Sequence, residues 1–86
     1  MAWRIELSAT ATRELAKLGR LEAGRITAYL RDRVAPHPRA VGRALAGPLG
    51  DLWRYRVGDY RIICELHDGL MRVLVIKLGH RREVYR

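Results

Sequence analysis

The sequence has 86 residues, which is enough for one domain over residues 1–86 and too few for two independent cores. Lysine and arginine together number 17 against nine acidic residues, so the formal net charge is +8, and all but two of the cations are arginine. A hydrophobic content of 49% excludes a disordered basic tail, and the longest apolar run, residues 73–76, is too short to span a bilayer. This balance predicts a globular protein that has no membrane partner and favours phosphate groups.

The cysteine count indicates the cellular compartment in which the protein resides. Cys64 is the only cysteine, so an internal disulfide is excluded, and residues 1–20 lack the apolar stretch of a secretion signal. We therefore expect a cytoplasmic protein. The histidines and Cys64 show no metal-ligand spacing, so we also expect no metal and no other cofactor.

The N-terminal half predicts one strand followed by two helices. Apolar and polar residues alternate over residues 2–7, as they do in a half-exposed strand. Ser8 can cap a helix that follows it, and Gly19 supplies the stop signal for that helix. Apolar residues then recur at helical spacing from Leu21 to about Val34, and two prolines follow.

The C-terminal half predicts a loop and then a three-stranded meander. Residues 39–51 contain glycines and a proline without a long periodic pattern, so we expect a loop with room for one helical turn. The dipeptides Gly58-Asp59 and Asp68-Gly69 suit two-residue hairpin loops. The segments around them are rich in β-branched and aromatic residues: 52–57, 60–66 and 70–78. The predicted fold class is α+β, with two N-terminal helices packed on a small antiparallel sheet of about four strands.

The first hairpin loop fixes which arginines share a face. A two-residue loop places Arg56 opposite Arg61 and Arg54 opposite Ile63. Like charges directly opposite on neighbouring strands repel, and a bound anion would relieve that repulsion. Long arginine side chains can also splay into water, so the pair alone does not define a site. The other face is the more apolar one and is the expected core side: Trp53, Tyr55, Val57, Tyr60, Ile62, Cys64 and Leu66.

The second hairpin brings the C-terminal segment toward these arginines. A two-residue loop there places Glu65 opposite Arg72 and Arg61 opposite Ile76. Arg81 then lies only a few residues beyond the position opposite Arg61. We therefore expect Arg81 to join the arginine face, which suits a phosphodiester better than a duplex groove because no basic recognition helix is evident.

These segments resemble the RelE branch of the RelE/ParE toxin superfamily, which comprises small ribosome-dependent mRNA interferases of bacterial toxin–antitoxin systems. The resemblance rests on three segments: Lys17-Leu18-Gly19, residues 52–63 of the first hairpin and residues 79–85. The family often has lysine at the positions of Arg54 and Arg56. The resemblance implies a nuclease site at the matching positions, which are Arg54, Arg56, Arg61, Arg81 and Tyr85.

The implied activity is that of an mRNA endoribonuclease that needs no metal and inhibits translation. Arg61 and Arg54 would hold the phosphate, and Arg81 would stabilise the leaving oxygen. Tyr85 would act as general base, because nearby positive charges favour its phenolate form. His80 is an alternative acid or base. The implied partners are a cognate antitoxin protein and the ribosome with its mRNA and rRNA.

Two other functions stay open. One is a ParE-like toxin that inhibits DNA gyrase without nuclease activity. The other is a basic nucleic-acid-binding module without catalysis, for which the charge of +8 would be sufficient.

Overall fold

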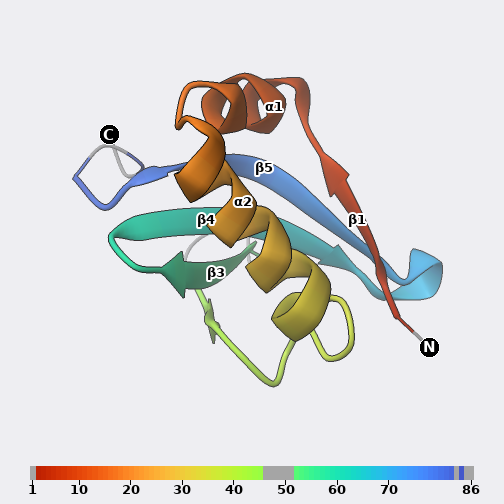
Figure 1. The fold of residues 1–86 in the computed structure, drawn as a ribbon. Helices are drawn as coiled ribbons and strands as arrows, with labels where there is room; N and C mark the ends of the chain where they lie inside the picture. The colour runs from red at the N-terminus through yellow and green to blue at the C-terminus, as the bar shows by residue number, and fades with distance from the viewer. Residues whose placement is uncertain (1, 46–51, 83, 85–86) are drawn as a thin grey trace.

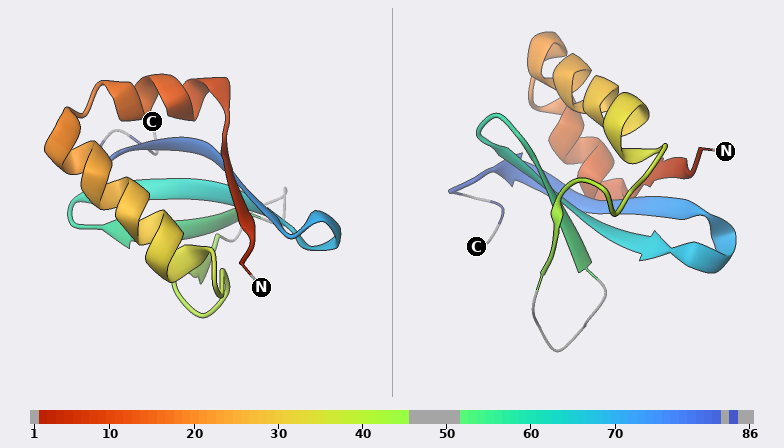
Figure 2. Two further views of the ribbon diagram at one scale, coloured as in Figure 1. Left: turned by 45° about the vertical axis from the view of Figure 1, so that its right-hand side comes forward. Right: turned by 90° about the horizontal axis from the view of Figure 1, so that it is seen from below.

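The structure is a computed structural model that describes residues 2–45, 52–82 and 84. Its strands form one sheet in the order β1-β5-β4-β3-β2, and both helices lie on one face of that sheet (Figures 1 and 2). None of the helices in the described ranges has the length and apolar character needed to cross a membrane. The elements in chain order are β1 (Arg4–Leu7), α1 (Ala9–Ala16), α2 (Arg20–Tyr29), β2 (Arg43–Ala44), β3 (Leu52–Val57), β4 (Tyr60–His67) and β5 (Arg72–His80).

The helices begin and end where the sequence predicts. Ser8 Oγ accepts a hydrogen bond from the backbone N–H of Ala11 at 3.0 Å, which satisfies one of the N–H groups left unpaired in the first turn of α1. Gly19 separates the two helices with a φ of +80°, a backbone conformation that side chains disfavour. α2 continues past its last residue into a π-helical turn, Leu30–Val34, and so reaches the predicted end of the second helix.

The core lies between the helices and the face of the sheet that the sequence predicts to be apolar. Tyr55, Ile62 and Cys64 on that face are fully buried, and Ile26 and Val34 meet them from the helical side. Burial raises the pKa of both the Tyr55 hydroxyl and the Cys64 thiol, since removal from water penalises their charged forms. The expected core face is therefore confirmed.

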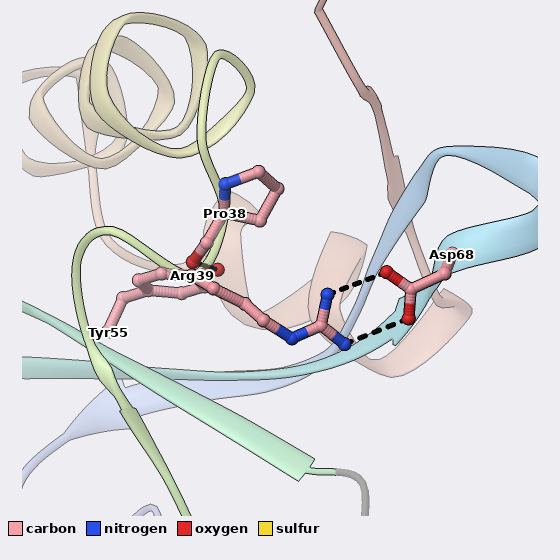
Figure 3. Close-up of polar contacts among 4 residues, drawn as sticks. All are labelled: Pro38, Arg39, Tyr55 and Asp68. Atoms are coloured by element: carbon pink, nitrogen blue, oxygen red, sulfur yellow. Dashed lines mark hydrogen bonds and ion pairs between the residues drawn. The ribbon is translucent and has the colours of Figure 1, made fainter.

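The segment that follows the helices is tied to the sheet by two polar contacts (Figure 3). The buried Tyr55 hydroxyl donates a hydrogen bond to the carbonyl oxygen of Pro38 at 2.7 Å. Beside it, the Arg39 guanidinium donates to both carboxylate oxygens of Asp68 at 2.6 and 2.9 Å. The hydrogen bond from Arg39 lowers the pKa of the Asp68 carboxyl group. These contacts bring the loop from α2 back toward β3, where β2 forms.

Two features of the sheet differ from the prediction. The sheet has a fifth strand among the described residues, because Arg43–Ala44 in the expected loop pairs with β3 as β2. The sheet is also not wholly antiparallel, because β1 pairs parallel with β5, from Arg4 opposite Arg72 to Leu7 opposite Val75. A strand of two residues shows no alternation, and the partner of an N-terminal strand is not encoded locally, so neither feature has a local sequence signal.

The predicted register of the second hairpin is wrong by three residues at Arg61. A 3₁₀ turn, Asp68–Leu70, and Met71 with a φ of +47° replace the expected two-residue loop. Farther along, Cys64 pairs with Val75 whereas Ile63 pairs with Lys77, so one extra residue of β5 forms a bulge. As a result, Arg61 lies opposite Gly79 and not opposite Ile76.

The predicted Glu65–Arg72 pair is wrong because the turn between β4 and β5 is longer than two residues. Glu65 lies opposite Leu74, and its carboxylate contacts His67 Nε2 at 2.8 Å. Arg72 lies opposite His67 and donates to its Nδ1 at 3.0 Å. The Arg72 guanidinium also lies 3.4 Å from the Glu6 carboxylate on β1. The Arg72 side chain thus has structural partners, although not the expected one.

Candidate active site

The β3–β4 hairpin gathers three of the candidate arginines on the face that the helices leave uncovered. The predicted register of this hairpin is confirmed, with Arg56 opposite Arg61 and Arg54 opposite Ile63. Gly58 has a φ of +59°, which the two-residue loop requires at its first position. Side chains alternate along a strand, so Arg54, Arg56 and Arg61 lie on the opposite face from the buried Tyr55.

Arg61 is the arginine of this face nearest to the hairpin loop. Its Nη1 lies 3.4 Å from the carbonyl oxygen of Gly58 and 3.3 Å from that of Tyr60. These long hydrogen bonds hold the guanidinium at the loop end of the hairpin. They use only part of its donor capacity, because a guanidinium carries five N–H groups. The remaining donors can bind an anion on this face.

Arg43 is a cation of this face that the sequence analysis missed. It lies on β2 directly opposite Arg54. With Arg54, Arg56, Gly42 and Tyr29 of α2, it lines a hollow of about 200 Å³. Gly42 allows the close approach of β2, because a Cβ at Gly42 would overlap the carbonyl oxygen of Arg54 and come within 2.7 Å of the Trp53 ring. The positive φ of Gly42, +73°, is a further reason for glycine there. The only signal in the sequence was the glycine before Arg43.

The C-terminal segment reaches the loop end of the same hairpin. The backbone N–H of Arg81 donates to the carbonyl oxygen of Asp59 in the loop at 2.8 Å. Arg81 follows Gly79, the partner of Arg61, by two positions, so the corrected register brings it closer to Arg61 than the predicted register does. Tyr85, the predicted general base, lies outside the described residues.

His80 belongs to the helix-facing side of the hairpin. It lies directly opposite Tyr60, and the two rings make an edge-to-face contact with their centroids 6.0 Å apart. Tyr60 packs against the hydrophobic core, so this pair lies on the other face from Arg61. The geometry therefore gives His80 a packing partner and separates it from the arginine face.

The arrangement is suited to holding a phosphate and offsetting new negative charge. Guanidinium groups stay protonated at any physiological pH and bind phosphate oxygens through two N–H groups at once. Three of the five candidate residues share one face of one hairpin, and the backbone of Arg81 is fixed at its loop. The face thus brings several positive charges together, and such charges can stabilise a transition state electrostatically.

Comparison with known proteins identifies the family of the chain. Residues 5–85 match the family of ParE toxins of type II toxin–antitoxin systems, parDE. The chain is 30% identical over 84 residues to the protein called toxin RelE of Mycobacterium tuberculosis, an alignment that covers 98% of this chain and 87% of the relative.

Two solved structures share the fold. The chain superposes on the toxin–antitoxin complex RelBE2 from Mycobacterium tuberculosis with a TM-score of 0.87 and 23% identity, covering 94% of this chain and all of that one. It superposes on the archaeal RelE–RelB complex from Pyrococcus horikoshii with a TM-score of 0.74 and 28% identity, covering 98% of this chain and 100% of the other.

These matches define the class of protein. The chain belongs to the ParE toxin family of type II toxin–antitoxin systems. Within the RelE/ParE superfamily it is a RelE-like toxin.

Proposed function

We propose that this toxin is a ribosome-dependent mRNA endoribonuclease whose site is the arginine face of the β3–β4 hairpin. One observation carries the proposal. Arg56 and Arg61 lie directly opposite each other, and the backbone of Arg81 is hydrogen-bonded to the loop that joins their strands. Guanidinium groups placed opposite each other on neighbouring strands can bind one phosphate group through several N–H donors at once.

The proposed reaction is an attack of the RNA 2′-hydroxyl on the adjacent phosphate. Tyr85 takes the 2′-hydroxyl proton, a bond forms between O2′ and phosphorus, and the bond from phosphorus to O5′ breaks. The products are a 2′,3′-cyclic phosphate and a 5′-hydroxyl. Arg54 and Arg61 hold the phosphate with help from Arg56, and Arg81 stabilises the leaving oxygen. Arginine holds its proton too firmly to donate it readily, so water or a ribosomal group supplies the proton to O5′.

The proposed partners follow from the same chemistry. The ribosome presents the mRNA, and its rRNA meets the remaining positive surface of a protein with a charge of +8. We further propose a cognate antitoxin with acidic or apolar segments that cover the basic sheet and the helices. The structurally similar RelE-type proteins were solved in complex with RelB proteins, which supports an antitoxin partner. The proposed location is the cytoplasm, where translating ribosomes are found.

Induction in bacterial cells tests this function against its alternatives. We expect new mRNA 5′ ends at positions occupied by ribosomes, and we expect them to disappear in the Arg61→Ala and Tyr85→Phe variants. The matching family is that of ParE toxins, so DNA damage without mRNA cleavage would favour a gyrase inhibitor. Growth unaffected by the induced protein would favour a non-catalytic nucleic-acid-binding module.

A further inference from the structure

The bulge in β5 determines which residues meet the candidate site. Without the extra residue at Ile76, a regular ladder would place Leu78 opposite Arg61, on the arginine face. With the bulge, Leu78 lies opposite Ile62 and is fully buried, while Gly79 lies opposite Arg61. The bulge therefore also determines where β5 ends relative to Arg61, and so where Arg81 lies.

Two side chains at α1 hold the backbone of β5 at this bulge. β1 pairs with β5 only as far as Leu7 opposite Val75, so the next backbone groups on that edge of β5 need other partners. The Ser8 hydroxyl donates to the carbonyl oxygen of Ile76 at 2.9 Å. The Glu14 carboxylate accepts a hydrogen bond from the backbone N–H of Leu78, also at 2.9 Å. Side chains of the helix and its N-cap thus satisfy backbone groups of β5 beyond the end of β1.

The Glu14 contact holds β5 three residues before Arg81. Leu78 is followed by Gly79, opposite Arg61, and by Arg81, whose N–H is bound to Asp59. A carboxylate that accepts from a backbone N–H makes a charge-assisted hydrogen bond, which is stronger than a neutral one. Glu14 is half-buried and lines a hollow with Leu78 and His80, so the contact is partly shielded from water.

We propose that Glu14 is a positioning residue for Arg81, acting through the backbone of Leu78. The inference rests on the proposed nuclease function and deepens it, because it assigns a role to a residue of α1 that lies outside the arginine face. Glu14 fixes the end of β5 in the bulged register, and that register delivers Arg81 to the hairpin loop beside Arg61. Loss of the contact leaves the fold in place and misplaces Arg81.

The test compares Glu14→Ala with Glu14→Gln, which keeps an acceptor oxygen, in the full chain acting on ribosome-bound mRNA. In single-turnover assays, we expect Glu14→Ala to lower the rate at saturating toxin by about 10- to 100-fold, as misplacement of a reacting group does. The toxin concentration that gives half of the maximal rate should change little. Glu14→Gln should stay within about threefold of wild type, since the hydrogen bond is weakened but kept. Asp32→Ala, which removes an exposed carboxylate on the helical layer, is the matched control and should cleave at the normal rate.

A double-mutant cycle separates positioning from general destabilisation. If Glu14 acts through Arg81, adding Glu14→Ala to Arg81→Ala should lower the residual rate by less than about twofold. An equal loss in both backgrounds, or full activity of Glu14→Ala, would overturn the proposal. Circular dichroism checks that each variant is folded.

A second measurement does not depend on catalysis. Amide hydrogen exchange at Leu78 and Arg81 should be faster in Glu14→Ala than in Glu14→Gln, because only the alanine variant lacks an acceptor for the Leu78 N–H. Unchanged exchange at Leu78 would contradict the positioning role even if the wild-type protein cleaves RNA. If exchange is faster in Glu14→Ala but the wild-type protein cleaves no RNA, the nuclease function is refuted. The role of Glu14 in holding the register of β5 would then stand.

Discussion

The two faces of the β3–β4 hairpin carry different kinds of side chain although the same two strands build them. On the face beneath the helices, Tyr55 and Ile62 are fully buried and neutral. On the other face, the charged residues Arg56 and Arg61 lie directly opposite each other. Because successive side chains point to opposite sides of a strand, neighbouring residues serve different purposes. The comparison indicates that stability and activity are separable in this hairpin.

The largest expected effect is on the arginine face. Arg61→Ala should lower the rate of mRNA cleavage by about 100- to 1000-fold, because it removes donors aimed at the transition-state charge. Its free energy of unfolding should change by less than about 0.5 kcal/mol, since only two long hydrogen bonds on the outer face disappear. Urea unfolding and single-turnover cleavage measure the two quantities. Arg33→Ala, which removes an exposed arginine of the helical layer, is the control of equal charge. A large loss of stability in Arg61→Ala would show that the faces are not separable.

At Ile62, the residue next to Arg61, we expect a loss of stability without a loss of activity. Ile62→Ala should lower the free energy of unfolding by about 2–5 kcal/mol, because it leaves a cavity in the core. At a temperature where the variant is fully folded, its cleavage rate should remain close to that of wild type. Val57→Ala, at the half-buried end of β3, should cost less. A variant of Ile62 that is stable but inactive would contradict the comparison.

Alkaline pH should destabilise the protein through the buried face. Tyr55 and Cys64 have raised pKa values in the folded chain, so above their ordinary pKa values of about 10 and 8.5 the unfolded chain releases protons that the folded chain keeps. Stability is therefore complete below these values and declines as the pH rises, by up to about 1.4 kcal/mol per pH unit for each group. Chemical unfolding at several pH values between about 8 and 11 measures the slope. Tyr55→Phe should reduce the slope above about pH 10, and an unchanged slope would show that Tyr55 does not contribute.

Local sequence rules predicted the first hairpin because local residues determine it. The dipeptide Gly58-Asp59 fixes a two-residue loop, and that loop alone determines that Arg56 lies opposite Arg61. The alternation of side chains then assigns the core face, which the burial of Tyr55 confirms. Helix capping by Ser8 is equally local, and it too was predicted.

The second hairpin was not predictable in the same way. Asp68-Gly69 has the composition of a two-residue loop, yet the structure forms a longer turn in which Met71 adopts a left-handed conformation. The bulge in β5 lies where side chains more than sixty residues away in the chain contact its backbone, since Glu14 accepts from the Leu78 N–H. No local pattern contains that information.

In the candidate site, too, the features determined by local sequence were predicted and the others were not. Arg54, Arg56 and Arg61 share a face because of the first hairpin, and their proximity was predicted. Arg43 was missed, because its strand has two residues and forms only against β3. Tyr85 lies outside the described residues, so its role as general base stays a prediction.

The most direct test of the arginine face as a nuclease site uses purified toxin, ribosomes and two mRNAs. The mRNAs differ only at the mapped cleavage position, where one carries a normal ribose and the other a 2′-deoxyribose. We predict that the normal mRNA is cut to a 2′,3′-cyclic phosphate and a 5′-hydroxyl, that the deoxy mRNA stays intact, and that Arg61→Ala cuts neither at a comparable rate. Cleavage of the deoxy mRNA, or unimpaired cleavage by Arg61→Ala, would contradict the proposed site and chemistry.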